Sequence, residues 1–228
     1  MVSPQVAGKE LVSGMELSLE EFLSRWEAIP ELKKAELIDG VVYVPSPVGI
    51  DHCHLDTTIV WWLKQYKAAT PGCKTGNNAT WKMLGQSPQP DSFLRILESH
   101  GGQSNGKGKL FEGAPELAVE ICVSTREVDF GSKRKLYQRA GVQEYITIES
   151  FRPRIVWRSL VNGTYRPIEP DAGGIFRSRC FPGLWLDFDA LHADDEIRMM
   201  RALNAGLATP EHAQFVEELA RRAAALRA

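Results

Sequence analysis

The stretch that decides the fold runs from Gly113 to Glu149: GAPELAVEICVST at 113–125, DFGSKRKLYQRAGV at 129–142 and EYITIE at 144–149. The apolar run Leu117–Val123 predicts a buried central strand. Residues 132–140 have helical character, and Gly141 stands where glycine commonly ends a helix. Strand, loop, basic helix and strand make a βαβ unit, so we expect an α/β fold.

Glu120 lies in the middle of this predicted buried strand. A carboxylate there is costly unless it is paired or holds a metal ion. Lys133 and Tyr137 are four residues apart and share one face of the predicted helix. The βαβ unit therefore brings a buried carboxylate near cations, and most of the functional argument rests on it.

The composition is that of an ordinary soluble globular protein, with 228 residues, 25% charged and a formal net charge of −2. Such a charge neither indicates nor excludes nucleic acid, because a local basic patch can act inside a neutral whole. The four cysteines form no C-x-x-C pair, which favours reduced thiols in a cytoplasmic protein. We expect no signal peptide and no membrane-spanning segment.

Outside the central unit, turn and cap signals divide the chain. Ser18 and Glu21 form a capping box before a helix, and Asp39-Gly40 predicts a hairpin whose first arm contains Glu36. Further elements are predicted as a helix at 51–67, strands near 80–84 and 93–97, a flexible surface loop at 99–109, a hairpin at 154–168 turning at Asn162-Gly163, a strand at 183–188 that closes the sheet, and a helix starting at Thr209-Pro210.

The acidic candidates for chemistry are Glu36, Asp91 and Glu120, and the basic candidates are Lys133 and Lys135. Two carboxylates brought together favour a divalent cation, which polarises a phosphoryl oxygen and lowers the pKa of bound water. A nearby lysine can stabilise developing negative charge. Each residue also has an explanation without chemistry. Asp91 follows Pro90 and could be a turn residue, a glutamate in a strand could face solvent at a sheet edge, and a lysine-rich helix face is usually solvated.

The order of several motifs resembles the Uma2 family of putative restriction endonucleases, which is assigned to the PD-(D/E)xK nuclease superfamily. The resemblance covers roughly residues 15 to 191 and is specific through the order of its motifs. These are Glu36-Leu-Ile-Asp-Gly40, Ser46-Pro47 followed by His52, Gln89-Pro90-Asp91, the run from Gly113 to Glu120, Ser124-Thr125, Asp129 with Lys133 and Tyr137, and the run from Ala140 to Tyr145.

The resemblance implies a Mg²⁺- or Mn²⁺-dependent DNA endonuclease in which Asp91 and Glu120 bind the metal and Glu36 supports the site. The superfamily lysine would fall at position 122, where this chain has Cys122. Members of this family also lack it, and Lys133 on the following helix is the natural substitute. His52, Lys135 and Tyr137 are further candidates for substrate contact.

The implied fold is restriction-endonuclease-like: a mixed, curved sheet flanked by helices, with a C-terminal helical appendage. The expected division is a flexible N-terminus at 1–14, a nuclease domain at 15–191 and a helical extension at 192–228. The apolar stripe Phe215, Leu219, Ala223 and Leu226 on the last helix suggests a homodimer whose two sites cut two strands. The 99–109 loop lengthens the spacing between Asp91 and Glu120, which a surface loop tolerates.

Two alternatives remain open from the sequence. The first is a non-catalytic nuclease-fold protein that binds nucleic acid or a protein partner, which Cys122 keeps open. The second is a zinc hydrolase using His52, His54 and Asp56, whose spacing matches an H-x-H-x-D motif. Zinc hydrolases with that motif usually have a second histidine after the aspartate, and Thr57 stands there instead. Basic residues around the predicted helix, Arg126, Lys133, Arg134, Lys135 and Arg139, suit either phosphate contact or solvent.

Overall fold

The computed structural model describes residues 10–45, 49–122, 128–150 and 154–227. Its centre is a six-stranded sheet in the order β11-β10-β9-β8-β5-β3. β8 and β9 are parallel and the other neighbours are antiparallel, so the sheet is mixed. The strands are β3 (Cys73–Asn77), β5 (Ser92–Ile96), β8 (Leu117–Cys122), β9 (Glu144–Glu149), β10 (Arg154–Val161) and β11 (Thr164–Ile168).

The predicted βαβ unit is confirmed. A π-helical turn η2 (Asp129–Lys133) continues into helix α4 (Arg134–Ala140) between the parallel strands β8 and β9. Gly141 ends α4 with a φ of 85°, a left-handed conformation that glycine adopts without steric cost. Val123 and the motif residues at 46–47 and 124–126 lie outside the described residues.

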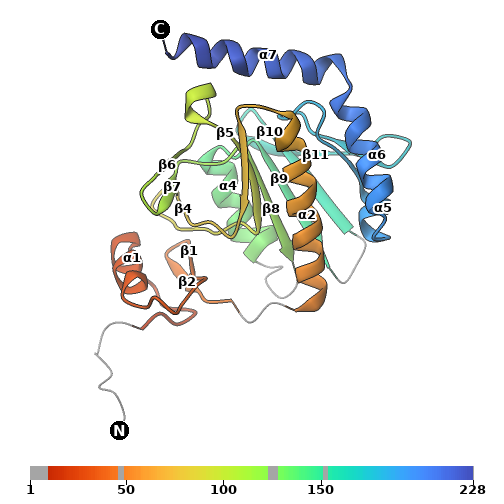
Figure 1. The fold of residues 1–228 in the computed structure, drawn as a ribbon. Helices are drawn as coiled ribbons and strands as arrows, with labels where there is room; N and C mark the ends of the chain where they lie inside the picture. Colours follow the sequence, from red (N-terminus) through yellow and green to blue (C-terminus); the bar gives the residue numbers. More distant parts are fainter. Residues whose placement is uncertain (1–9, 46–48, 123–127, 151–153, 228) are drawn as a thin grey trace.

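Helices cover both faces of the sheet (Figure 1). Helix α2 (Ile50–Ala69) packs Ile59, Leu63 and neighbouring side chains against one face, with Leu117 and Val119 of β8 in the same core cluster. Helix α4 covers the other face, where Ala118 packs with Leu136 and its neighbours. Because side chains alternate along a strand, Glu120 and Cys122 point toward the α4 side with Ala118.

The N-terminal part packs beside the α4 face. Helix α1 (Leu19–Glu27) begins at Ser18, whose hydroxyl accepts from the Glu21 N–H as the capping signal predicted. The hairpin of β1 (Glu36–Ile38) and β2 (Val41–Tyr43) turns at Asp39-Gly40. Residues 10–14, predicted to be part of a flexible terminus, are instead tied down: Gly14 N–H donates to Val42 and Leu11 is buried.

The 99–109 segment is not the flexible loop that the sequence predicted. It contains a 3₁₀ turn η1 (Glu98–His100) and strand β6 (Asn105–Lys107), which with β4 (Trp81–Lys82) and β7 (Leu110–Glu112) forms a three-stranded sheet. Gly102 lies so close to the Ile96 carbonyl oxygen that a Cβ would clash. Gly102 is therefore needed for a close approach of two backbone segments. From the sequence pattern alone, the same glycine indicated a flexible loop.

The C-terminal elements are β12 (Ile175–Arg177), β13 (Trp185–Asp187), α5 (Phe188–His192), α6 (Glu196–Leu207) and α7 (Pro210–Ala225). β13 pairs with β12 in a separate sheet, so the expectation that 183–188 closes the central sheet is wrong. Met199, Leu203 and Leu219 belong to the main core cluster. The 192–228 extension therefore completes the core instead of standing apart from it. No helix among the described residues is long and apolar enough to cross a membrane.

Candidate active site

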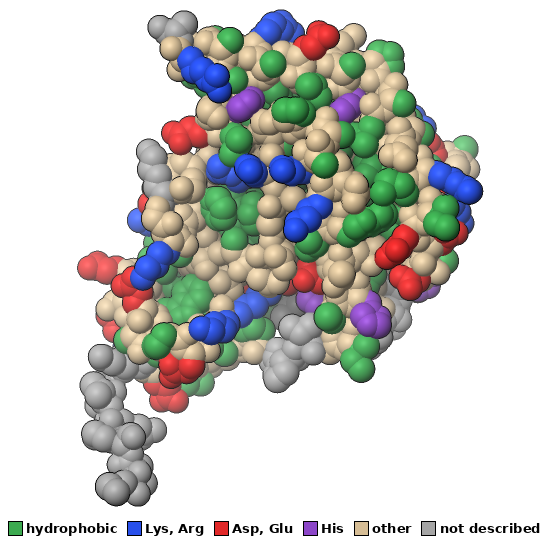
Figure 2. All heavy atoms as spheres, in the orientation of Figure 1, with side chains coloured by type: hydrophobic (Ala, Val, Ile, Leu, Met, Phe, Trp, Pro, Cys, Tyr) green, Lys and Arg blue, Asp and Glu red, His purple; other side chains and the backbone are tan. Residues whose placement is uncertain are grey.

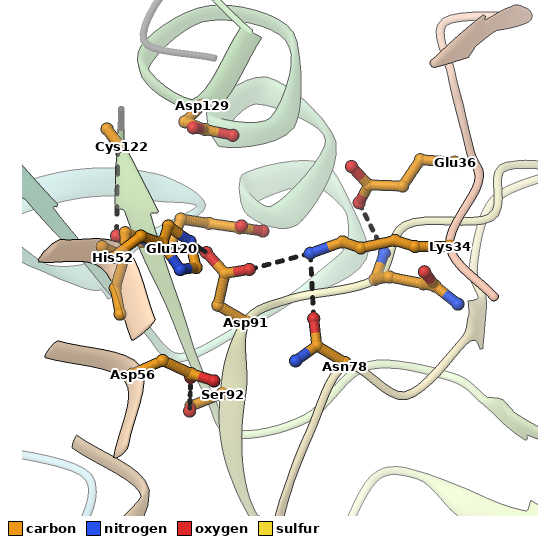
Figure 3. Close-up of polar contacts among 12 residues, drawn as sticks. Lys34, Glu36, His52, Asp56, Asn78, Asp91, Ser92, Glu120, Cys122 and Asp129 are labelled. Carbon is orange, nitrogen blue, oxygen red and sulfur yellow. Dashed lines mark hydrogen bonds and ion pairs between the residues drawn. The ribbon is translucent and has the colours of Figure 1, made fainter. Parts of the chain in front are cut away.

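Asp91 and Glu120 meet across two antiparallel strands. The register pairs Ser92 with Val119, so the next position brings Asp91 opposite Glu120. The Asp91 Oδ2 atom accepts from the backbone N–H of Ile121 at 2.8 Å, which fixes its carboxylate against β8. Figure 3 shows both carboxylates side by side. The structure thus brings the predicted metal-binding pair together.

Glu36 joins this cluster from the β1–β2 hairpin. Backbone hydrogen bonds between Leu37 and Ser87 tie β1 to the segment that leads into Asp91. The Glu36 Oε1 atom accepts from the Gln89 N–H at 2.6 Å, and its Oε2 atom lies 2.9 Å from the Lys133 ammonium. The third predicted carboxylate therefore faces the same site.

Lys133 lies at the centre of the buried carboxylates. Its Nζ atom is 2.9 Å from Glu36, 3.0 Å from Glu120 and 3.4 Å from Asp129, and its side chain is 3% exposed. Burial alone would lower the pKa of Lys133, but Glu120, Glu36 and Asp129 outweigh it and raise that pKa well above its ordinary value. Lys133 is therefore a permanent cation that holds three carboxylates together.

The other two predicted helix residues differ from each other. Tyr137 is fully buried and donates its hydroxyl to Glu120 Oε1 at 2.8 Å, so it orients that carboxylate and does not face an incoming substrate. Lys135 is exposed on the other side of α4, as expected for a residue two positions along a helix from Lys133.

His52 reaches the cluster from the first turn of α2. Its Nε2 atom lies 3.4 Å from Asp91 Oδ2. The hydrogen bond to Asp91 raises the pKa of His52. Burial alone would raise the pKa of Asp91, but His52, Lys34 and Lys133 hold it well below its ordinary value. His52 thus supports an ionised Asp91.

The zinc trio is not assembled. His54 is exposed, whereas His52 contacts Asp91, and Asp56 accepts from the Ser92 hydroxyl at 3.3 Å. Positions two apart on a helix point in nearly opposite directions, so His52 and His54 cannot bind one ion without distorting α2. In the described parts of the chain, no three His, Cys, Asp or Glu side chains are arranged to hold a metal.

Sequence reasoning missed Lys34 and gave Asp129 no role in the site. The Lys34 Nζ atom donates to Asp91 Oδ1 at 2.8 Å and to Asn78 Oδ1 at 2.9 Å (Figure 3). Lys34 and Glu36 stand two positions apart in extended chain, which places their side chains on one face. Asp129 precedes Lys133 by one helical turn, an i, i+4 spacing that predicts an ion pair. Both signals were present in the sequence.

Burial raises the pKa of Glu120 well above its ordinary value, and Asp91, Asp129 and Glu36 add to the shift against the opposing Lys133 charge. Burial also raises the pKa of the Cys122 thiol, which stays protonated beside Asp129. Lys34, Lys133 and His52 therefore favour the ionised carboxylates of this cluster, while burial and mutual repulsion oppose them. Asp91 and Glu120 are the two facing carboxylates that could offer oxygen ligands to a cation.

The family model described as "Putative restriction endonuclease", Uma2, matches residues 19–189. The chain belongs to the Uma2 family. A crystal structure titled as a putative nuclease belonging to DUF820 from Anabaena variabilis has a TM-score of 0.60 at 20% sequence identity, covering 78% of this chain and 98% of that one. That likeness confirms the fold. No curated protein matches the chain. Uma2 membership is the comparison that points to a nuclease, and a nuclease implies a nucleic-acid substrate.

Proposed function

We propose that this Uma2 protein is a Mg²⁺- or Mn²⁺-dependent endonuclease that hydrolyses phosphodiester bonds in DNA by attack of water on phosphorus. The observation that supports the proposal best is the convergence of Asp91 and Glu120 on adjacent strands, with lysines beside them. Two carboxylates can hold a divalent ion that activates water, and a lysine beside them can stabilise developing negative charge.

The chemistry of the two proposed ligands fits a hard divalent ion. The carboxylates of Asp91 and Glu120 supply only oxygen, which Mg²⁺ and Mn²⁺ prefer. The Lys34 ammonium already contacts Asp91, at a position that a metal ion could also take. Asp91 and Glu120 would hold the ion, which supplies Lewis-acid activation of the phosphate and of water.

The remaining residues prepare the two ligands. Lys133 neutralises Glu120 and Glu36, so that these carboxylates stay together without repelling each other apart. Tyr137 donates to Glu120 Oε1 and so fixes the orientation of the whole carboxylate. His52 and the Ile121 N–H hold Asp91 Oδ2. In this proposal Lys133 substitutes for the superfamily lysine that is missing at Cys122, and it acts by holding the carboxylates of Glu36 and Glu120 in place.

A basic surface beside the site suits a phosphate backbone. Lys and Arg side chains gather in the middle of the face shown in Figure 2, over β3 and the adjoining part of α2. Lys74 on β3 and Lys64 on α2 are exposed. β3 is an edge strand whose last residue, Asn77, pairs with Ser92 next to Asp91. A strand of DNA lying along this edge would reach the carboxylates.

The test is nicking or linearisation of supercoiled plasmid with Mg²⁺, Mn²⁺ or EDTA, together with calorimetric titration of Mn²⁺ without DNA. Asp91→Asn and Glu120→Gln should each weaken Mn²⁺ binding and lower cleavage by roughly two to three orders of magnitude. The control is Glu112→Gln, since Glu112 is an exposed carboxylate on β7 whose ion pair is with exposed Lys82. Wild-type protein that binds no divalent ion and cuts no DNA would instead support the alternative, a non-catalytic binding module.

Two further expectations belong to this proposal. A homodimer would place two sites on two strands. Of the predicted dimer stripe, however, Leu219 and Ala223 are buried within the chain itself, Phe215 is half-buried and Leu226 is exposed. Light scattering coupled to gel filtration tests the dimer. A cytoplasmic location stays a prediction from the reduced cysteines, which form no disulfide in the structure.

A further inference from the structure

The two lysines of the site lie in different environments. The Lys133 side chain is 3% exposed and contacts three carboxylates. The Lys34 side chain is 26% exposed and pairs with Asp91 alone among the described carboxylates. Lys34 precedes β1, and its side chain extends to the Asp91 carboxylate (Figure 3). One lysine is therefore enclosed by the cluster, and the other closes it toward solvent.

Counting donors separates their roles further. An ammonium has three N–H groups. The Lys133 ammonium is enclosed by Glu36, Glu120 and Asp129 at 2.9–3.4 Å, so a substrate would have to push a carboxylate aside to reach it. Among the described residues, Lys34 donates to Asp91 and Asn78, so one of its three N–H groups is not used by these contacts. Of the two lysines, Lys34 is therefore the one that a phosphate oxygen can reach from solvent.

Asp91 has one oxygen that a metal ion can reach by exchange. Its Oδ2 atom is held by the Ile121 N–H at 2.8 Å and faces His52 at 3.4 Å. Its Oδ1 atom accepts from Lys34 at 2.8 Å. An ion that binds Asp91 through Oδ1 must therefore displace the Lys34 ammonium, which is the more exposed and more easily moved of its partners.

We propose that Lys34 occupies the cation position at Asp91 in the ion-free protein and, once a divalent ion takes that position, contacts a non-bridging oxygen of the scissile phosphate. This rests on the proposed function. The displaced ammonium sits at the end of a flexible four-carbon chain beside the reacting group. It exchanges a carboxylate oxygen for an anionic phosphate oxygen, so its charge stays paired throughout.

The exchange also accounts for the residue at position 122. Cys122 is buried, and neither a thiol nor a thiolate carries positive charge, so it supplies none to the phosphate. Lys133 does not supply it either, because three carboxylates enclose its ammonium. In this scheme the two tasks of one lysine are divided: Lys133 holds the carboxylates and Lys34 contacts the substrate. No proton leaves Lys34, which acts as a charged hydrogen-bond donor to the developing phosphorane charge.

The experiment compares wild type with Lys34→Met, which keeps most of the side-chain volume and removes the charge. Mn²⁺ binding is measured without DNA by calorimetry, and plasmid cleavage at saturating Mn²⁺. Lys34→Met should bind Mn²⁺ about tenfold more tightly, because a competing positive charge is gone. It should cleave roughly two to three orders of magnitude more slowly. Lys33→Met is the matched control, since that neighbouring lysine is exposed and donates to the Pro30 carbonyl oxygen.

The outcomes are distinct. Unchanged Mn²⁺ affinity in folded Lys34→Met overturns the displacement, and unchanged cleavage overturns the phosphate contact; in both cases wild-type cleavage that depends on Asp91 leaves the proposed function standing. If neither wild type nor Lys34→Met binds Mn²⁺, the inference and the proposed function fail together. Tighter binding with slower cleavage, absent in Lys33→Met, supports the inference. Circular dichroism melting confirms that each variant is folded.

Discussion

Two buried glutamates on neighbouring strands, Glu120 on β8 and Glu144 on β9, point to opposite faces of the sheet and are stabilised differently. Glu144 aligns with Leu117 and faces the α2 side, whereas Glu120 faces α4. Four neutral donors surround Glu144: the Arg179 and Cys180 N–H groups, the Ser178 hydroxyl and the Trp157 indole, at 2.6–2.9 Å. Glu120 instead shares the Lys133 ammonium with other carboxylates.

The difference separates structure from chemistry. The donors around Glu144 tie β9 and β10 to the segment before β13, and they leave no room for another ligand. The cluster around Glu120 concentrates several negative charges. Neutral hydrogen-bond donors would stabilise a single buried carboxylate at a lower free-energy cost. A chain that needed only a stable sheet would have no reason to keep three carboxylates around one lysine. That surplus of charge is what the proposed cation site requires.

The largest effect should follow from breaking the shared ion pair. Lys133→Met leaves Glu36, Glu120 and Asp129 without their common cation, and loss of one partner of a buried pair typically costs about 3–5 kcal/mol. Urea unfolding should show this loss, and cleavage should fall with it. Lys135→Met, exposed on the same helix, should stay within about 0.5 kcal/mol of wild type. Equal stability of Lys133→Met and wild type would mean that the cluster is not held by this lysine.

A smaller effect should distinguish the two glutamates directly. Glu144→Gln places an amide NH₂ against donors, which should cost about 1–3 kcal/mol of unfolding free energy while Mn²⁺ binding and cleavage are retained. Glu120→Gln should do the reverse, because removing one charge from a crowded acidic cluster relieves repulsion while it deletes a metal ligand. If both variants lost stability but kept Mn²⁺ binding and cleavage, Glu120 would have a structural role like that of Glu144.

The pH dependence of stability gives a further test of the role of Glu144. Burial raises the pKa of Glu144 despite its hydrogen bonds, so the folded state binds a proton more tightly than the unfolded chain. Its contribution to stability is then fully present below the unfolded pKa of about 4.3 and is lost as pH rises through the folded pKa. Wild type should therefore exceed Glu144→Gln in stability by the largest margin near pH 4. A margin that is constant between pH 4 and 8 would contradict this.

Local signals in the sequence predicted much of the scaffold. Asp39-Gly40 and Asn162-Gly163 turn their hairpins with positive φ at all four residues, as the primed turns require. Thr209 caps α7 through the His212 N–H, and Pro210 opens that helix. These features depend on residues a few positions apart, so composition and spacing suffice to place them.

From spacing alone, the site could be predicted only where side chains share an element or a register; the resemblance to Uma2 placed Glu36 and Asp91 with Glu120. Glu120 and Tyr137 were predictable because the βαβ unit sets their elements side by side. The spacing from Glu36 placed Lys34 on the same face, but its contact with Asp91 was not predictable, since that contact spans 57 positions and depends on how the β1 hairpin docks. The same reason explains β13: its strand character is local, but its pairing with β12 instead of the central sheet is a tertiary choice.

The smallest effect should come from two tyrosine hydroxyls that differ only in what they contact. Tyr137 and Tyr145 are both fully buried, with ring centroids 5.1 Å apart. Tyr137 donates to Glu120 Oε1 at 2.8 Å, and Tyr145 donates to the Asp129 carbonyl oxygen at 2.9 Å. Each Tyr→Phe change removes one buried hydrogen bond and should cost about 1 kcal/mol of unfolding free energy.

Cleavage should separate the two variants although their stabilities match. Tyr137→Phe frees a Glu120 oxygen, so the carboxylate loses its fixed orientation and cleavage should fall by about tenfold, the rate equivalent of about 1.4 kcal/mol. Tyr145→Phe leaves Glu120 as it is and should cleave like wild type. Single-turnover plasmid cleavage at saturating Mn²⁺ measures the difference. Equal rates in the two variants would show that Glu120 is oriented by Lys133 alone, and the role of Tyr137 would then be confined to packing against β8.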